Sequence, residues 1–127
     1  MKIDHIALYV QDLERVKRFF EVYFQAAAGE RYNNFRTGFS SCFLTFQEGA
    51  RLELMSREEL RTPERTSFCA GYHHLSLSVG SQAAVDRLTR WLAQDGYAVV
   101  SGPRTTGDGC YESVILDEEG NQIEITE

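Results

Sequence analysis

The chain contains one short pattern twice, about half its length apart. Two segments of the first half return in the second: DHIAL at 4–8 as HHLSL at 73–77, and RLEL at 51–54 as QIEI at 122–125. His5 and His74 are 69 positions apart, and Glu53 and Glu124 are 71 positions apart. The sequence therefore predicts one structural module written twice, with a His and a Glu at matched places in each copy.

Each copy has the same predicted order of elements, β-α-β-β-β. A helix cap and a stop flank each helix: Asp12 and Gly29 in the first copy, Ser81 and Gly96 in the second. Apolar residues at helical spacing favour a helix over about 12–28 and another between Ser81 and Gly96. Strands are predicted at about 3–10, 32–37, 40–47, 50–56, 73–79, 97–101, 111–117 and 121–126. A break is expected at Gly102-Pro103.

The predicted fold class is α+β, with tandem βαβββ modules. We expect a single domain over 1–127, built from a module at about 1–60, a polar linker at about 57–70 and a module at about 71–127. One module alone cannot cover both faces of its sheet. Two modules are therefore expected to form a curved mixed sheet, with helices on the outer face and a concave inner face.

Strand alternation predicts which side chains lie on that inner face. Aliphatic residues at every second position should pack against the helices, because successive side chains point to opposite faces of a sheet. They occur at 6, 8 and 10, at 52 and 54, at 75, 77 and 79, and at 123 and 125. His5, Glu53, His74 and Glu124 then all fall on the opposite face.

Two imidazoles and two carboxylates form a complete ligand set for one divalent metal ion. The N₂O₂ set suits Zn, Ni, Co, Mn or Fe, and no cysteine belongs to it. Such an ion acts as a Lewis acid that holds two neighbouring substrate oxygens and stabilises an enediolate or an alkoxide. A ligand that loosens its hold would serve as general base, and both Glu53 and Glu124 are candidates.

Other polar residues are candidates for substrate binding. Arg51 stands two positions before Glu53, where it would either contact an anionic substrate or pair with an acid. Arg36, Arg104 and Tyr111 are expected near the mouth of the concave face. His73 is interpreted as a residue at the start of a strand, not as a ligand.

Composition excludes several kinds of partner. The net charge of -6, without a cluster of Lys and Arg, disfavours nucleic acid. No apolar run is long enough to cross a bilayer, and the strand-like sequence directly after Met1 predicts that the chain carries no signal peptide. Three cysteines without CxxC spacing favour reduced thiols and a cytoplasmic location.

These motifs together resemble the vicinal oxygen chelate superfamily, which includes glyoxalase I, bleomycin-resistance proteins and extradiol dioxygenases. The resemblance covers nearly the whole chain. It rests on DHIALYV at 4–10, RLELM at 51–55, YHHLSL at 72–77 and DEEGNQIEI at 117–125, which is similar to the family ending Asp-Pro-x-Gly-Asn-x-Ile-Glu. Glu118 stands where proline is common. The resemblance implies that His5, Glu53, His74 and Glu124 bind one metal, as in glyoxalase I.

The implied function is a metal-dependent lyase or isomerase of glyoxalase type, acting on a small oxygenated substrate, either free or conjugated to a thiol. The alternatives are a thiol transferase or epoxide hydrolase similar to fosfomycin-resistance enzymes, and a non-catalytic protein that sequesters a ligand. Short loops and no recognisable glutathione contacts leave the substrate open. Family members often dimerise, so the resemblance also implies a homodimer.

Overall fold

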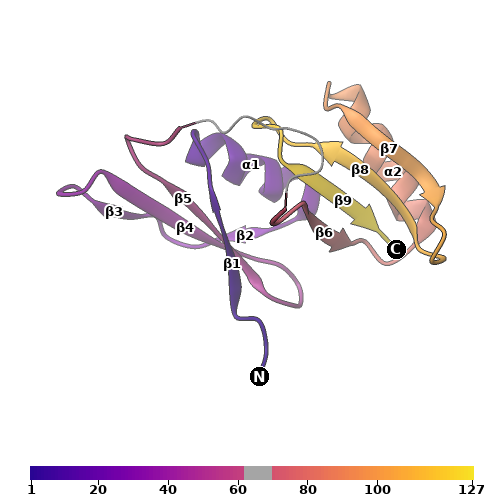
Figure 1. Cartoon of the computed structure of the whole chain (residues 1–127), viewed down its shortest axis with the longest axis horizontal. Helices are drawn as coiled ribbons and strands as arrows, with labels where there is room; N and C mark the ends of the chain where they lie inside the picture. Colours follow the sequence, from indigo (N-terminus) through magenta and orange to yellow (C-terminus); the bar gives the residue numbers. More distant parts are fainter. Residues whose placement is uncertain (62–69) are drawn as a thin grey trace. The chain divides into compact units, whose positions relative to one another are not determined.

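The structure is a computed structural model that describes residues 1–61 and 70–127. The remaining residues, 62–69, belong to the predicted linker and lie outside the described part. The chain divides into two compact units, Met1–Glu64 and Arg65–Glu127 (Figure 1). Each unit has its own sheet and its own helix.

The first unit has one helix and a five-stranded sheet. Its elements are β1 (His5–Tyr9), α1 (Leu13–Phe24), β2 (Ala27–Ala28), β3 (Tyr32–Asn34), β4 (Phe39–Thr45) and β5 (Arg51–Ser56). The strand order is β1-β5-β4-β2, and β3 pairs with β4. β1 and β5 are parallel, whereas β4 is antiparallel to its neighbours.

The second unit repeats this plan without a counterpart of β2. Its elements are β6 (His74–Ser78), α2 (Gln82–Gln94), β7 (Val99–Thr105), β8 (Tyr111–Leu116) and β9 (Gln122–Thr126). The strand order is β6-β9-β8-β7, with β6 parallel to β9. The predicted α+β class and its βαβββ modules are confirmed. In the described part of the chain, neither helix is long and apolar enough to span a bilayer.

Both helices begin at the predicted caps. The Asp12 side chain accepts a hydrogen bond from the Arg15 amide at 3.0 Å, and Ser81 accepts one from the Ala84 amide at 3.3 Å. The first helix ends earlier than predicted. Gln25 adopts a left-handed conformation with φ 54°, and the next residues pair with β4 as β2. The helix predicted to residue 28 therefore stops at Phe24.

β7 is the second difference from the predicted elements. The sequence predicts a break at Gly102-Pro103, but the strand continues to Thr105. The pairing with β8 shifts register between Ser101 and Arg104, so the strand passes these two residues and pairs again. The shift allows the ladder to continue past a residue that has no amide hydrogen to donate.

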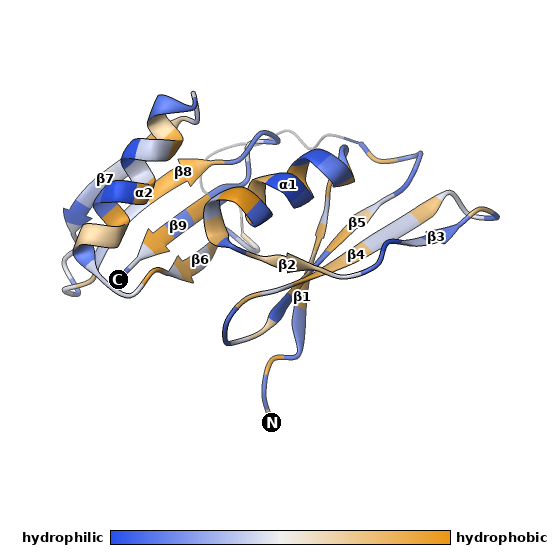
Figure 2. Cartoon of the chain, turned by 180° about the vertical axis from the view of Figure 1, so that it is seen from behind, coloured by the Kyte–Doolittle hydropathy of each residue, from blue (hydrophilic) through white to orange (hydrophobic). Residues whose placement is uncertain are grey.

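The core lies between each helix and the face of its own sheet. In Figure 2, hydrophobic and hydrophilic residues are interspersed along both helices, as expected for helices that are buried on one side. The fully buried side chains of the first unit include Val16, Phe19, Phe20, Leu44 and Leu54. Those of the second include Val85, Leu92, Ile115, Ile123 and Ile125.

The edge strands are less covered than alternation predicts. Val10 is buried, but Ile6 is 38% exposed and Leu75 is half-buried. β1 and β6 lie at the edges of their sheets. In the first unit, α1 packs on β2, β4 and β5, so the outermost strand receives little cover from it.

Candidate metal centre

The first ligand pair is His5 on β1 and Glu53 on β5. Because these strands are parallel neighbours, with Ala7 directly opposite Glu53, the two side chains project from the same face of the sheet. His5 Nε2 lies 3.8 Å from Glu53 Oε2. Leu52 and Leu54, on either side of Glu53, are buried on the helix side. Alternation within β5 therefore directs the carboxylate away from the core.

The second pair, His74 on β6 and Glu124 on β9, has the same construction. The strands are again parallel neighbours, and Ser76 stands directly opposite Glu124. His74 Nε2 lies 3.4 Å from Glu124 Oε2. Ile123 and Ile125 are buried on the helix side of β9. Each unit thus presents one imidazole and one carboxylate on the face opposite its helix.

Both pairs fit two positions in a metal coordination sphere. A tetrahedral ion with bonds of about 2.1 Å separates its ligand atoms by about 3.4 Å. The measured separations of 3.8 and 3.4 Å are near that value. The side chains of Glu53 and Glu124 are only 16% and 15% exposed, while the imidazoles are 39% and 36% exposed. The imidazoles are therefore more exposed than the carboxylates, which are partly shielded from water.

Neither pair is a complete site by itself. Across residues 1–61 and 70–127, no group of three or more His, Cys, Asp or Glu side chains is arranged to hold a metal ion. Protein zinc sites use three or four ligands. A four-ligand centre therefore requires both pairs to meet on one ion, and that set stays a prediction.

Asp4 orients the imidazole of the first pair. Its Oδ2 lies 2.9 Å from His5 Nδ1 and also accepts from the Arg51 guanidinium. The hydrogen bond from His5, followed by that from Arg51, holds the pKa of Asp4 below its usual value. An ionised carboxylate accepts the Nδ1 proton and leaves Nε2 without one on the side of Glu53. Carboxylates play this role behind many metal-bound histidines.

An aromatic ring borders the same pair. Phe43 on β4 is the register partner of Glu53. Its ring meets the His5 ring edge-on at 5.3 Å, and the Arg51 guanidinium lies 4.5 Å from its centre. These contacts restrict the His5 ring and place a cation beside it.

The second pair is supported differently. Ser76 donates to Glu124 Oε1 at 2.6 Å, so the other carboxylate oxygen is the one that faces His74. His74 Nδ1 lies 3.1 Å from His73 Nδ1, where the first pair has an aspartate.

Burial, followed by the charge of Glu124, raises the pKa of Glu112 on β8. A second carboxyl group therefore lies close to the ligand Glu124.

The predicted substrate-binding residues lie in different places. Arg51 lies beside the first pair and is bound to Asp4. Arg36 lies in the turn after β3, and its amide donates to the Asn34 side chain. Arg104 is the register partner of Glu112 and therefore shares the face of the second pair. Substrate contact by these arginines stays a prediction.

Tyr111 points the other way. Its hydroxyl donates to Asp86 on α2 at 2.7 Å, so its side chain lies on the helix side of β8. The structure therefore does not bring Tyr111 to the face of the second pair. The buried Ser113, on the same side of β8, confirms this orientation of the strand.

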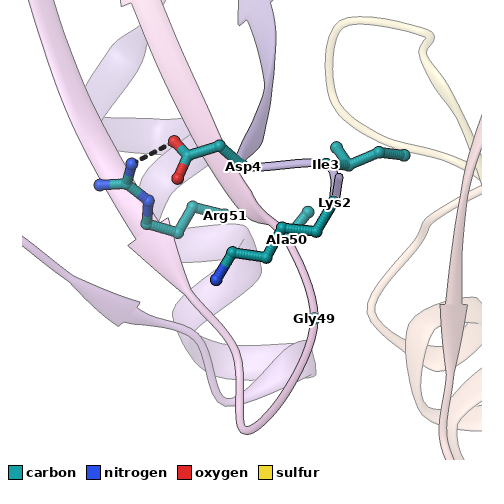
Figure 3. Close-up of a pocket in the computed structure, with 6 residues that line it drawn as sticks. All are labelled: Lys2, Ile3, Asp4, Gly49, Ala50 and Arg51. Carbon is teal, nitrogen blue, oxygen red and sulfur yellow. Dashed lines mark hydrogen bonds and ion pairs between the residues drawn. The ribbon is translucent and has the colours of Figure 1, made fainter.

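A surface pocket opens where β1 and β5 begin, next to the first pair. Figure 3 shows its lining residues and the ion pair between Asp4 and Arg51. They are Lys2, Ile3, Asp4, Gly49, Ala50 and Arg51. The Asp4 that orients His5 is therefore itself accessible from this pocket.

Sequence reasoning missed the supporting residues Asp4, Phe43 and Glu112. Once β8 is placed, alternation predicts the position of Glu112. Ser113 and Ile115 are buried on the helix side, so Glu112 lies on the opposite face, which is the face of the second pair. Asp4 and Phe43 carry no comparable signal, since their contacts depend on register between strands that are distant in sequence.

Comparison with known proteins agrees with this architecture. The family model of the Glyoxalase/Bleomycin resistance protein/Dioxygenase superfamily matches residues 2–125, so the chain belongs to this superfamily. An uncharacterized protein of Bacillus subtilis (strain 168), YqjT, is 28% identical over 124 residues, which cover 95% of this chain and 94% of that protein.

Solved structures share the fold at low sequence identity. A glyoxalase/bleomycin resistance protein/dioxygenase domain from Frankia sp. EAN1pec has a TM-score of 0.82 and 21% identity, over 99% of this chain and 96% of that one. A trypanothione-dependent glyoxalase I of Leishmania major has a TM-score of 0.80 and 16% identity, over 99% of this chain and 86% of that one. At these identities the likeness concerns the fold alone.

Proposed function

We propose that His5, Glu53, His74 and Glu124 bind one divalent metal ion and that the chain is a metal-dependent lyase or isomerase of glyoxalase type. The observation that carries the proposal is the repeated construction of the two pairs. In each, a His and a Glu on parallel neighbouring strands face away from the helix at 3.8 or 3.4 Å. Family membership supports the same interpretation.

When bound by such ligands, a divalent ion supplies Lewis acidity to the oxygens of a substrate carbonyl and its neighbour. The residues of the chain have the remaining tasks. Asp4 and Ser76 orient one ligand in each pair. A partly shielded carboxylate, Glu53 or Glu124, accepts a proton from the carbon next to the carbonyl. Arg51, bound to Asp4 and Phe43, places a positive charge beside the first pair.

The proposed substrate is small and oxygenated, and the proposed assembly is a homodimer in the cytoplasm. In a dimer, the two pairs on one ion come from one chain or from two. Light scattering with and without metal tests the assembly. An inactive mixture of His5→Ala and Glu124→Gln proteins argues for ligands within one chain, whereas recovery of activity on mixing argues for a shared site.

Metal content and turnover test the function. Protein dialysed against Ni²⁺ or Zn²⁺ is expected to retain one ion per chain and to lose it after Glu53→Gln or Glu124→Gln. The metal-loaded protein is then assayed with methylglyoxal and glutathione. If neither metal supports turnover, the protein is not a glyoxalase I, although the proposal of a metal-dependent lyase or isomerase with another substrate still stands. Failure to bind metal, together with full ligand binding, supports a sequestering protein instead.

A further inference from the structure

Four side chains form an unbroken row at the second pair. Gln122 Nε2 lies 3.2 Å from His73 Nε2, and His73 Nδ1 lies 3.1 Å from His74 Nδ1. On the far side of its ring, His74 Nε2 lies 3.4 Å from Glu124 Oε2. The two ends of the row lie on β9 and its middle lies at the start of β6, where Gln122 is the register partner of His74. His73, just before β6, therefore connects a residue of β9 to the imidazole of the ligand pair.

The donors and acceptors of this row determine where its protons lie. A neutral imidazole has one donor nitrogen and one acceptor nitrogen, whereas an amide nitrogen only donates. Gln122 therefore donates to His73 Nε2, which places the His73 proton on Nδ1. His73 Nδ1 then donates to His74 Nδ1, which places the His74 proton on Nε2, facing the carboxylate of Glu124.

The first pair has the opposite arrangement. Asp4 accepts a hydrogen bond from His5 Nδ1 at 2.9 Å, so the His5 proton lies on Nδ1 and Nε2 has a free lone pair. Metal ligation through Nε2 requires that lone pair. His5 is therefore ready to bind, whereas His74 has a proton on the nitrogen that faces Glu124.

We propose that His73 and Gln122 are positioning residues that set the tautomer of His74, and that metal binding by the second pair reverses the whole row. In the reversed row, His74 Nδ1–H donates to His73 Nδ1, and His73 Nε2–H donates to Oε1 of Gln122 after its amide rotates. Both imidazoles stay neutral in both states. The metal-binding part rests on the proposed function, whereas the tautomers of the metal-free protein do not.

The substitution Gln122→Glu tests the row directly. A carboxylate at 122 accepts only, so it favours the reversed row in the absence of metal. Gln82→Glu is the matched control, since it adds the same charge to the same unit at an exposed position of α2. Long-range ¹H–¹⁵N spectra of metal-free protein, at about pH 8.5 where ordinary imidazoles are neutral, report which nitrogen carries each proton.

The expected spectra show His73 protonated on Nδ1 and His74 on Nε2 in the wild type and in Gln82→Glu. In Gln122→Glu both should reverse, while His5 keeps its proton on Nδ1 in all three proteins. A His74 tautomer that is the same in wild type and Gln122→Glu would overturn the proposal. So would a wild-type His74 already protonated on Nδ1.

Zinc titration tests separately whether the row is coupled to metal binding and whether the protein binds metal at all, as the proposed function requires. Because the reversed row is already present, Gln122→Glu should bind Zn²⁺ about tenfold more tightly than wild type and Gln82→Glu, within the range known for residues behind metal ligands. Equal affinities in all three proteins would overturn the coupling of the row to metal. If no protein binds Zn²⁺, the proposed function fails, and the tautomer spectra still decide the role of His73 and Gln122.

Discussion

The Ser76 hydroxyl donates to one oxygen of Glu124 at 2.6 Å, and the other oxygen of that carboxylate faces His74 at 3.4 Å. The first pair has no equivalent donor at the matched position, because Ala7 stands opposite Glu53. The two copies of the module thus differ in how they hold the same ligand types. One copy orients its imidazole with an aspartate, and the other orients its carboxylate with a serine.

Ser76→Ala should weaken metal binding. Without the hydroxyl, Glu124 can rotate away from His74. Removal of a residue that hydrogen-bonds a metal ligand typically lowers metal affinity by roughly tenfold. Ser78→Ala is the matched control, because it removes a hydroxyl from the same strand at the next position of the same face. Titration with Zn²⁺ should show the loss in Ser76→Ala alone, and equal affinities in the two variants would contradict the assigned role.

Asp4→Asn should also weaken metal binding, by about tenfold. An amide is a poorer acceptor than a carboxylate for the Nδ1 proton of His5, and it gives up the ion pair with Arg51. Glu48→Gln, at an exposed turn position of the same unit, controls for the lost negative charge. The prediction fails if the two variants lose affinity to the same extent.

Gly102→Ala should lower the free energy of unfolding by about 2 kcal/mol. Gly102 has a φ of 78°, and a Cβ there would clash with the Glu112 carbonyl oxygen and lie 2.9 Å from the Cα of Ser113. Gly107→Ala is the control, because a methyl group at that position would meet no atom within 4 Å. Urea denaturation should give a change near zero for Gly107→Ala, and similar losses for the two glycines would count against the described packing of β7 on β8.

Asp117→Asn should destabilise the turn before β9 by about 1 to 2 kcal/mol at neutral pH. The buried Asp117 carboxylate accepts from the amides of Glu119 and Asn121 and from the Asn121 side chain, at 2.7 to 2.9 Å. An asparagine replaces one acceptor oxygen with an NH₂ group that cannot accept, whereas a carboxyl group keeps two acceptor oxygens whether it is ionised or protonated. Chemical denaturation of both proteins gives the difference.

The same pair of proteins should show a pH dependence. Burial raises the pKa of Asp117 above 3.8, so the folded protein binds this proton more tightly than the unfolded chain does. Stability contributed by Asp117 is therefore greatest below pH 3.8 and decreases as the pH rises toward the folded pKa. The wild-type advantage over Asp117→Asn should shrink across that window, and an advantage that grows there would contradict the assignment.

Much of the fold could be predicted because local patterns and burial agree. The aliphatic residues around Glu53 and Glu124 are buried as alternation requires, and both helix caps form at Asp12 and Ser81. The errors occur where tertiary pairing overrides a local signal. The pairing of β2 with β4 ends the first helix early, and a register shift takes β7 past Pro103.

The supporting contacts of the ligand pairs were harder to predict. The sequence places His73 at the start of a strand, and the structure adds that its ring contacts both His74 and Gln122. That contact depends on the parallel register of β6 and β9, which no local pattern encodes. Tyr111 shows the same limit, since its partner Asp86 lies on a helix 25 positions earlier.

Calorimetric titration of Zn²⁺ into the wild type, Glu53→Gln and Glu124→Gln tests the central claim most directly. If the two pairs share one ion, the wild type binds one Zn²⁺ per chain, and each substitution weakens that same binding event. Two ions per chain in the wild type would contradict the shared centre. So would a Glu53→Gln protein that still binds one Zn²⁺ with undiminished affinity, because the pair of His74 and Glu124 would then act alone.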